Sequence, residues 1–216
     1  MKQEKLNKIL ELHQKWRKKE AGGKRANLNG ADLSNADLTG ANLELARLEG
    51  ANLRETNLQK ANLNNARLEG ADLQKANLKD SNLSGADLSK ANLRGANLQQ
   101  ADLTGADLYY ADLEGADLSD AVVKAAGLFS ANLKNSNLNG VIFVASNLKE
   151  ANLSGANLQG ADLSVVYLEN ANLENADLTN ANFEDTDLQG VDLSKCKNLD
   201  TAKNFNVKNG VHDENF

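Results

Sequence analysis

A repeat of five residues runs without interruption from Ala26 to Lys195 and constrains the fold more than any other feature. Each block reads Ala-(Asn/Asp)-Leu-x-x, and 34 blocks follow one another with no insertion or deletion. The third position is Leu in 31 blocks, with Val123, Phe143 and Phe183 as the exceptions. A period of five fits neither the 3.6 residues of a helical turn nor the two of a flat strand. The chain must therefore turn at fixed intervals.

This pattern predicts an all-β solenoid of stacked coils. If each block forms one side of a coil, the Leu and the Ala two residues before it face the interior, and the other three positions face water. Short repeats of this kind bury their apolar face only against neighbouring repeats. The hydrophobic 41% of the chain is mostly Ala and Leu, with no proline, which is unlike an average globular core.

The blocks resemble those of the pentapeptide repeat family, whose motif centres on Leu or Phe with Ala two residues earlier. The resemblance covers residues 26–195. It implies a right-handed quadrilateral β-helix with four blocks, or twenty residues, in each coil. We therefore expect about 8.5 coils, which at a spacing of ~4.8 Å between hydrogen-bonded backbones make a rod about 40 Å long.

Three parts are expected along the chain: a cap and linker at 1–25, the β-helix at 26–195, and a C-terminal cap or tail at 196–216. A β-helix exposes unpaired backbone at its ends, which invites end-to-end association unless something covers it. We predict an amphipathic α-helix over residues 3–20, ended by Gly22-Gly23, that covers the first coil. Its covering face comprises Leu6, Ile9, Leu10, His13 and Trp16.

The five-residue register is lost after Lys195, and the remaining apolar residues are irregularly spaced. They suit either a C-terminal cap or the surface of a homodimer, and the sequence leaves both open. These residues are Leu199, Phe205, Val207, Val211 and Phe216.

Charge is distributed unevenly between the parts. Residues 1–25 carry nine Lys/Arg and three Asp/Glu, giving +6, whereas residues 26–195 carry twelve and twenty-four, giving −12. The rod is thus acidic, which does not favour nucleic-acid binding, and the leading segment is basic. The helix face opposite the cap could still meet anionic lipid or nucleic acid. It carries Lys8, Lys15, Arg17, Lys18 and Lys19.

One coil places a carboxylate on all four sides, and we name it the acidic belt. Carboxylates on separate faces cannot converge on a metal ion or on a reacting group, so no metal, cofactor or acid–base role is expected. In a neighbouring column Asp87 stacks on Asp107, with Arg67 as the expected counter-charge. The acidic belt comprises Asp102, Asp107, Asp112, Glu114, Asp117 and Asp120.

Beside the acidic belt, outward positions that are polar elsewhere become apolar, which is typical of an interaction surface. These side chains could also form a surface for self-association. Alternatively, a local distortion at Val123 and Phe143 could turn some of them inward. We name this set, with Val165, the corner patch: Tyr109, Tyr110, Val122, Phe129, Ile142, Val144 and Tyr167.

The sequence contains no nucleophile–base set, phosphate-binding loop or Cys/His metal cluster, so an enzyme is not expected. We predict a non-catalytic scaffold that binds a protein partner through the acidic rod. The family resemblance implies one alternative, a DNA-mimicking regulator of DNA gyrase, and the basic helix implies another, binding to an anionic surface. With no apolar stretch of roughly 18 residues, no secretory leader and a single cysteine, Cys196, a cytoplasmic protein is expected.

Overall fold

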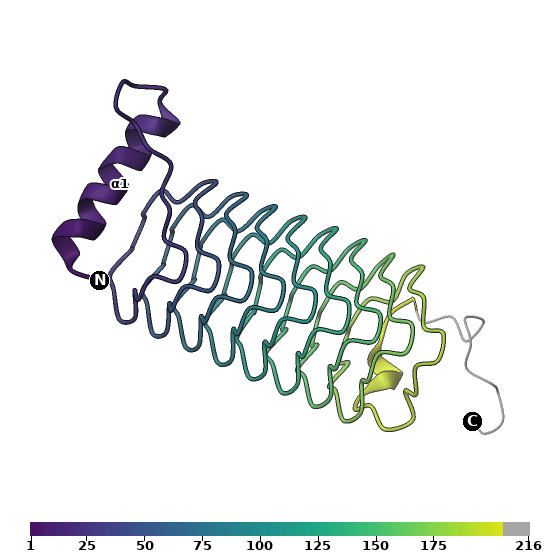
Figure 1. The fold of residues 1–216 in the computed structure, drawn as a ribbon. Coiled ribbons are helices and arrows are strands. Elements are labelled where there is room, and N and C mark those ends of the chain that lie inside the picture. The colour runs from purple at the N-terminus through teal and green to yellow at the C-terminus, as the bar shows by residue number, and fades with distance from the viewer. Residues whose placement is uncertain (205–216) are drawn as a thin grey trace.

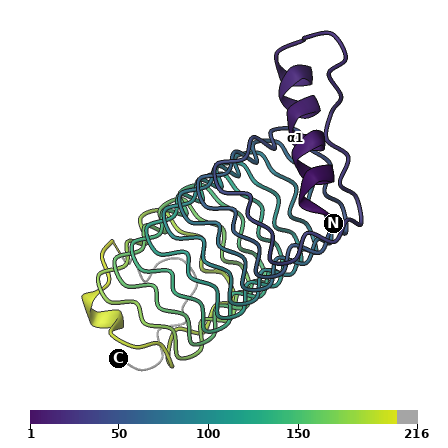
Figure 2. The same ribbon diagram turned by 90° about the vertical axis from the view of Figure 1, so that its left-hand side faces the viewer.

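The computed structural model describes residues 1–204, which form an elongated rod with one helix across its N-terminal end (Figure 1). Helix α1 spans Gln3–Arg17, and a short 3₁₀ helix, η1, spans Leu199–Thr201. Between them, parallel bridges join residues twenty apart, from Asn27↔Arg47 to Asp177↔Lys197. The coils stack in line along one axis (Figure 2).

The described residues contain no β-strand longer than a single bridged residue, so the expected all-β sheet structure is only partly present. The reason is that each side of a coil has only three extended residues before a two-residue turn, so that one residue of each side forms a bridge. Each side still makes regular bonds to the next coil. The amide of Leu33 donates to the Asn52 carbonyl at 2.8 Å, and the amide of Asn52 donates to the Ala31 carbonyl at 2.9 Å.

The blocks define four faces of the rod. Face 1 contains the blocks that begin at residues 26, 46, 66 and so on, and faces 2, 3 and 4 contain those that begin five, ten and fifteen residues later. Face 4 shares a corner with face 1, because each block of face 4 runs directly into the next block of face 1.

The interior is a stack of leucines with alanines between them. Almost every third-position residue is fully buried, as are most first-position alanines, which confirms that these two positions face inward. Where Thr or Ser replaces Ala, the buried hydroxyl donates a hydrogen bond to a backbone carbonyl. The Thr56 hydroxyl donates to the Leu33 carbonyl at 2.8 Å, and the Thr186 hydroxyl to the Leu163 carbonyl at 2.7 Å. A hydroxyl is tolerated here because it is hydrogen-bonded.

The second-position Asn and Asp side chains hold the corners of the coils. Their Oδ1 atoms accept the amide two residues later, as Asp32 does from Ser34 at 3.2 Å. Where Asn stacks on Asp, the amide also donates to the carboxylate, as Asn132 does to Asp112 at 2.8 Å. The alternation of Asn with Asp thus replaces a repulsion between carboxylates with a hydrogen bond.

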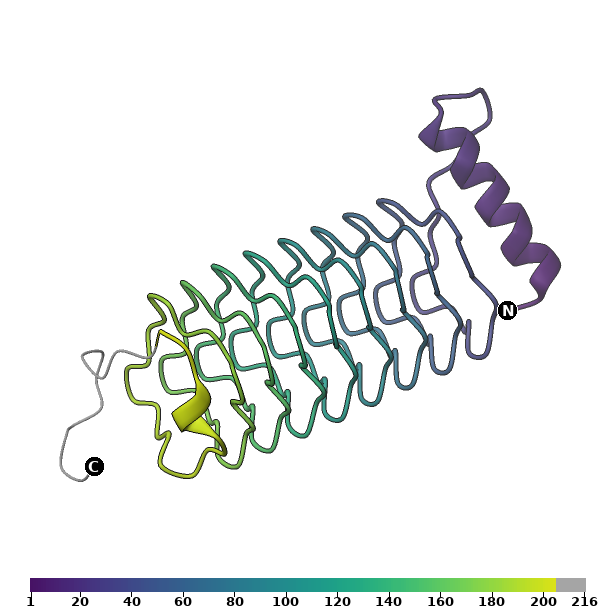
Figure 3. The same cartoon turned by 180° about the vertical axis from the view of Figure 1, so that it is seen from behind.

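Helix α1 crosses the open end of the first coil (Figures 1 and 3). Leu6 and His13 are buried beneath it, Ile9 and Leu10 pack against the core, and Trp16 is half-buried. The helix ends at Arg17, three residues before the predicted end. Lys19 adopts a positive φ of 58°, and the Glu20 amide donates to the Lys15 carbonyl, so the chain turns before Gly22.

His13 links the helix to the first block of the repeat. Its Nδ1 accepts the amide of Ala26 at 3.1 Å, and its ring stacks on Trp16 with 5.5 Å between centroids. Burial lowers the pKa of His13, and the nearby charges of Arg17 and Arg25 lower it further, against the raising effect of Glu44. The neutral ring is therefore the form that fits this position.

At the C-terminal end the coil continues past Lys195 with an extra residue. Asp177 bridges Lys197, twenty residues on, but Asn182 bridges Lys203, twenty-one residues on. Asn198, with a φ of 56°, begins the 3₁₀ turn that takes up the difference. Leu199 packs against the core, as Cys196 does. The predicted apolar residues Phe205, Val207, Val211 and Phe216 lie outside the described residues.

We expect the rod to lose stability as the pH falls from about 7.5 to about 5.5. A histidine with a lowered pKa in the folded state contributes stability above its unfolded pKa of about 6.5, and that stability is lost as the pH falls below it. Thermal unfolding followed by circular dichroism measures this dependence. The variant His13→Asn keeps an acceptor for the Ala26 amide and should flatten this pH dependence; an unchanged slope in His13→Asn contradicts the assignment.

Candidate interaction surface

Faces 4 and 1 carry the side chains that break the polar pattern of the rod. Tyr109, Tyr110, Phe129 and Tyr167 come from blocks of face 1, and the aliphatic members come from blocks of face 4. The most exposed are Tyr110 at 57%, Tyr167 at 48%, Val165 at 46% and Tyr109 at 40%. The members of the corner patch therefore lie on two adjacent faces, with Tyr109, Tyr110 and Phe129 in the turns that end face 1 and the aliphatic members on face 4.

Three aromatic rings form a cluster at the centre of this patch. The Tyr110 and Phe129 rings meet edge to face, with centroids 5.7 Å apart and planes at 90°. The Tyr109 and Phe129 rings are 6.3 Å apart at 66°. Edge-to-face pairs of this kind are favourable beyond the area that they bury. The rings are thus held in a fixed arrangement before any partner binds.

Gly127 makes room for this cluster. It occupies a second position, where 28 of the 34 blocks have Asn or Asp, and the Tyr109 ring lies directly over it. A Cβ at residue 127 would overlap that ring. Sequence reasoning missed this residue, although a glycine at a second position is itself a departure from the repeat.

The backbone under the aliphatic part of the patch is regular, so the alternative of a local distortion is wrong. Val122 bridges Ile142 in register, and the core residues Val123 and Phe143 are fully buried. Val122, Ile142 and Val144 lie outward and are half-buried. The wider Phe143 fits the interior without displacing the coil.

At the C-terminal side of the patch, Tyr167 has a charged neighbour. The Lys149 Nζ lies 5.8 Å from the centroid of the Tyr167 ring and pairs with Glu169 at 2.6 Å. The hydrogen bond to Glu169 raises the pKa of Lys149. Sequence reasoning missed Lys149, which follows Phe129 in the same column.

Two members of the corner patch occupy backbone positions that their residue types disfavour. Tyr110 and Val165 are fifth-position residues with φ of 60° and 58°, the left-handed region. Glycine or asparagine fills this position in many blocks, because both adopt such a conformation at low cost. A β-branched residue there is an outlier, and strain of this kind concentrates at functional sites.

The acidic belt is neutralised on one side only. On face 2, Arg94 pairs with Asp112 at 3.2 Å and with Glu114 at 2.5 Å, and its hydrogen bond lowers the pKa of Glu114. Asp102 and Asp107, on faces 4 and 1, have no cation within ion-pair distance among residues 1–204. The same holds for Asp117 and Asp120 on face 3, so the uncompensated carboxylates of the belt include those beside the corner patch.

The expected pairing of Arg67 with the stacked Asp87 and Asp107 is absent. Arg67 instead pairs with Glu49 at 3.0 Å, in the coil on its other side. The Asp87 carboxylate accepts the amide and hydroxyl of Ser89, at 3.1 and 2.6 Å. Local hydrogen bonds, rather than an ion pair, thus stabilise this carboxylate.

The basic side of α1 is also partly neutralised. Lys8 and Lys15 both pair with Glu11, at 2.9 and 3.0 Å, and Arg17 pairs with Glu44 at 2.5 Å. Lys18 and Lys19 follow the helix and carry no ion pair within the part of the chain that the structure describes. The face available to an anionic surface is smaller than the sequence indicates.

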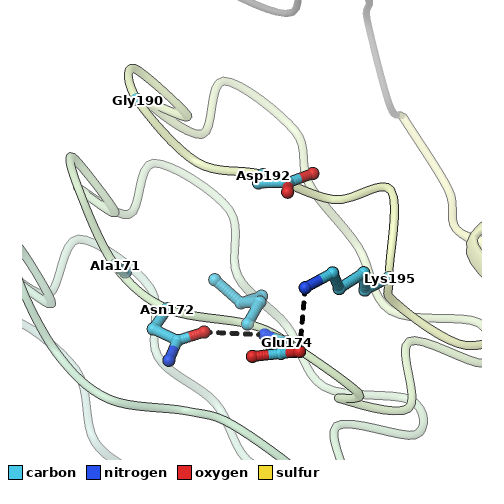
Figure 4. Close-up of a pocket in the computed structure, with 7 residues that line it drawn as sticks. Ala171, Asn172, Glu174, Gly190, Asp192 and Lys195 are labelled. Carbon is cyan, nitrogen blue, oxygen red and sulfur yellow. Dashed lines mark hydrogen bonds and ion pairs between the residues drawn. The ribbon is translucent and has the colours of Figure 1, made fainter.

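A cavity of about 220 Å³ lies near the C-terminal end of face 2 (Figure 4). It opens where the expected bridge between Asn172 and Asp192 is missing, so that two successive coils separate locally. An ion pair of 3.0 Å between Lys195 and Glu174 closes one side. Its lining comprises Ala171, Asn172, Leu173, Glu174, Gly190, Asp192 and Lys195.

Within residues 1–204, no three side chains of His, Cys, Asp or Glu gather in a way that could hold a metal ion. The same residues contain no helix of the length and apolar character that a membrane span needs.

Stacked four-sided coils with a patterned outer surface define a repeat protein of the β-helical class. The chain belongs to the pentapeptide repeat family, whose members form right-handed quadrilateral β-helices. The family model, Pentapeptide repeats, matches in eight copies over residues 24–54, 51–89, 81–120, 128–164 and 166–197. A comparison with curated proteins gives no match.

Several solved structures are similar to this chain. HetL, a pentapeptide repeat protein involved in heterocyst differentiation regulation in the cyanobacterium Nostoc, is 32% identical, with 89% of this chain and 93% of HetL covered and a TM-score of 0.44. A pentapeptide repeat protein of the Arabidopsis thaliana thylakoid lumen is 33% identical over 44% of this chain and 67% of its own, also at 0.44.

Full-length QnrB1, a plasmid-mediated fluoroquinolone resistance protein, is 21% identical, with 81% of this chain and 92% of QnrB1 covered and a TM-score of 0.43. All three TM-scores lie below 0.5, so the family assignment rests on the sequence.

Replacing Gly127 by Asn should displace the Tyr109 ring while leaving the rod folded, because Asn suits the second position but overlaps the ring. Contacts between the Tyr109 and Phe129 rings in nuclear Overhauser spectra should disappear. The matched variant Gly105→Asn, at a glycine with nothing within 4 Å of its Cβ position, should keep them. Retention of the contacts in Gly127→Asn contradicts the proposed packing.

Proposed function

We propose that this chain is a non-catalytic interaction protein that binds a protein partner through the corner patch. The rod supplies a rigid support, because every coil is bonded to the next and the core is continuous. The patch combines fixed aromatic rings with half-buried aliphatic side chains on a surface that is polar elsewhere. Aromatic residues are enriched in protein interfaces and carry much of their binding energy.

The observation that carries this proposal is the left-handed backbone conformation of two exposed members of the patch, Tyr110 and Val165. Tyr110 and Val165 are the most exposed apolar side chains in left-handed positions, and neither is needed in the core. Their conformations cost about 1 kcal/mol or more each relative to glycine. Since such a residue destabilises the rod and projects into solvent, we infer that it contacts a partner protein.

The rim of the patch indicates what the partner surface must offer. Asp102 and Asp107 lie on the N-terminal side without cation partners, whereas Lys149 on the other side is paired with Glu169. Charged groups at the rim of an interface steer association and select partners more than they add affinity. The partner surface is therefore expected to place no carboxylate opposite Asp102 and Asp107.

The double variant Tyr110→Asn with Val165→Asn should be more stable than the wild type and should bind its partner less well. Asparagine relieves the left-handed strain, so the unfolding temperature should rise by about 2–4 °C for each kcal/mol gained. Affinity capture from the native cell, followed by quantitative mass spectrometry, measures binding. Gln100→Asn, at a left-handed position with φ of 58° on face 3, is the matched control. Higher stability with undiminished capture contradicts the proposal.

A second candidate is regulation of DNA gyrase by charge mimicry of duplex DNA. The observation that favours it is the charge of −12 over residues 26–195. Pairing of Arg94 with Asp112 and Glu114, and of Arg54 with Asp72, locally reduces the acidic character of face 2. Mimicry would therefore depend on the other faces.

A supercoiling assay with purified gyrase tests this second candidate. Mimicry predicts inhibition of supercoiling, or protection of gyrase from a quinolone, at micromolar protein, and the effect should weaken with added salt because screening acts on exposed charges. Asp87→Asn with Asp107→Asn should weaken the effect. Unchanged gyrase activity across the whole protein titration counts against mimicry and leaves the corner patch proposal intact.

A further inference from the structure

Face 1 changes its charge along the rod. Its second-position column begins with Asn27, Arg47 and Arg67, continues through Asp87, Asp107, Gly127, Asn147 and Tyr167, and ends with Asp187. The aromatic cluster lies midway between the two charged ends. This column is thus basic near its N-terminal end, carries two carboxylates before its uncharged centre, and is acidic at its C-terminal end.

The basic end carries more positive charge than its own carboxylates neutralise. Arg67 pairs with Glu49, but no ion pair is recorded for Arg47 in residues 1–204. Arg25 lies close to both: burial lowers its pKa, and repulsion from Arg47 and Arg67 lowers it further. The carboxylates at this end are Glu49, which pairs with Arg67, and Glu69, which pairs with Lys90, so Arg25 and Arg47 have no ion-pair partner among residues 1–204.

The acidic end is likewise not neutralised by an ion pair. The Asp187 carboxylate accepts the amide of Gln189 at 3.1 Å and has no cation within 4.0 Å among the described residues. Lys149, the nearest lysine in the neighbouring column, pairs with Glu169. A cation from outside the rod can reach Asp187 without displacing an existing partner.

A face with opposite charges at its two ends is complementary to itself when one copy is reversed. We propose that a second copy of this chain docks on face 1 in the antiparallel direction, about a two-fold axis at the coil of Phe129. This proposal rests on the proposed function, because it names the partner of the corner patch. In a two-fold interface the same surface is used by both copies, so each pairing occurs twice.

The twenty-residue register fixes which residues meet. Coils at equal distances on either side of the axis face each other, so Arg67 lies opposite Asp187 and Asp87 lies opposite Tyr167. Within the patch Tyr109 faces Lys149, and Phe129 faces its own copy. No two like charges of the second-position column meet, and the tyrosine hydroxyl of residue 167 can donate to the Asp87 carboxylate.

A parallel arrangement in register fails on the same column. There Arg47, Arg67, Asp87 and Asp107 would each face their own copy, and every such pair repels by about 1 kcal/mol at 4 Å even in water. A partner of uniformly positive charge would meet Arg25, Arg47 and Arg67 unfavourably. The antiparallel copy is the arrangement that satisfies both ends of the face.

The size of the surface predicts a weak dimer. The six coil spacings between Arg67 and Asp187 give a length of about 29 Å, and the three extended residues of each side give a width of about 10 Å. Such a strip covers about 300 Å² of each copy, which is below the roughly 1,000 Å² in total that a stable specific interface buries. We therefore expect a weak dimer with a dissociation constant of about 100 µM or more.

Sedimentation velocity over a series from about 1 µM to about 300 µM measures the association. Asp187→Arg should weaken the dimer about tenfold, because a rim pair of up to ~1 kcal/mol is lost twice. Adding Arg67→Glu should restore it. Asp192→Arg is the matched control, since Asp192 is an exposed carboxylate of the same coil on face 2 that accepts the Ser194 amide at 2.9 Å. Thermal unfolding of each variant checks that the rod is folded.

Disulfide cross-linking tests the direction, in a Cys196→Ser background that removes the one native thiol. Ser130→Cys lies beside the axis and should cross-link to its own copy, whereas Asn139→Cys on face 3 should not. Glu69→Cys should cross-link to Gln189→Cys in a mixture faster than either does alone. These positions leave the aromatic cluster intact.

Two outcomes overturn the proposal: a wild-type chain that remains monomeric over the whole series, or a Glu69→Cys variant that cross-links to itself faster than to Gln189→Cys. Neither outcome removes the proposed function, which is judged by capture of a different protein through Tyr110 and Val165. If capture fails while the antiparallel dimer forms, the corner patch serves self-association alone.

Discussion

The rest of the structure depends on the closure of each coil at twenty residues. Four third-position side chains, nearly all of them leucines, meet inside each coil, and the sides of successive coils are hydrogen-bonded to one another. A residue more or fewer in a block would rotate every later Leu away from the interior unless a turn took up the difference, and the 34 blocks contain no insertion. The register changes only after Lys197, where the 3₁₀ turn η1 takes up one extra residue.

This closure makes the surface predictable in columns. Residues twenty apart stack, so a side chain interacts with its neighbours in the same column as well as with adjacent residues in sequence. Asn132 therefore donates to Asp112, and Arg94 reaches Glu114 in the coil above. A single outward substitution changes two such contacts, one on each side, while the leucine core is unaffected.

The corner patch departs from this pattern of polar contacts within columns. It places aromatic and β-branched residues where the repeat elsewhere uses polar or flexible ones, and it retains left-handed strain at Tyr110 and Val165. The continuous core tolerates this cost because each strained residue lies in a coil bonded on both sides. The same rigidity holds the aromatic rings in place, which reduces the ordering cost of binding.

The sequence alone determined the period, the buried positions and the family, because a strict five-residue repeat of Leu and Ala has one way to hide its apolar groups. It also predicted the corner patch, since Tyr109, Phe129 and Val122 break a pattern that is otherwise polar. Only the tertiary structure decided how charges pair. Arg67 forms an ion pair with Glu49 and not with Asp87, and Arg94 neutralises one side of the acidic belt. Register gives each side chain its column, but long side chains reach up or down the column according to local competition. That competition is settled by packing and hydrogen bonds in three dimensions, as with the Tyr109 ring over Gly127.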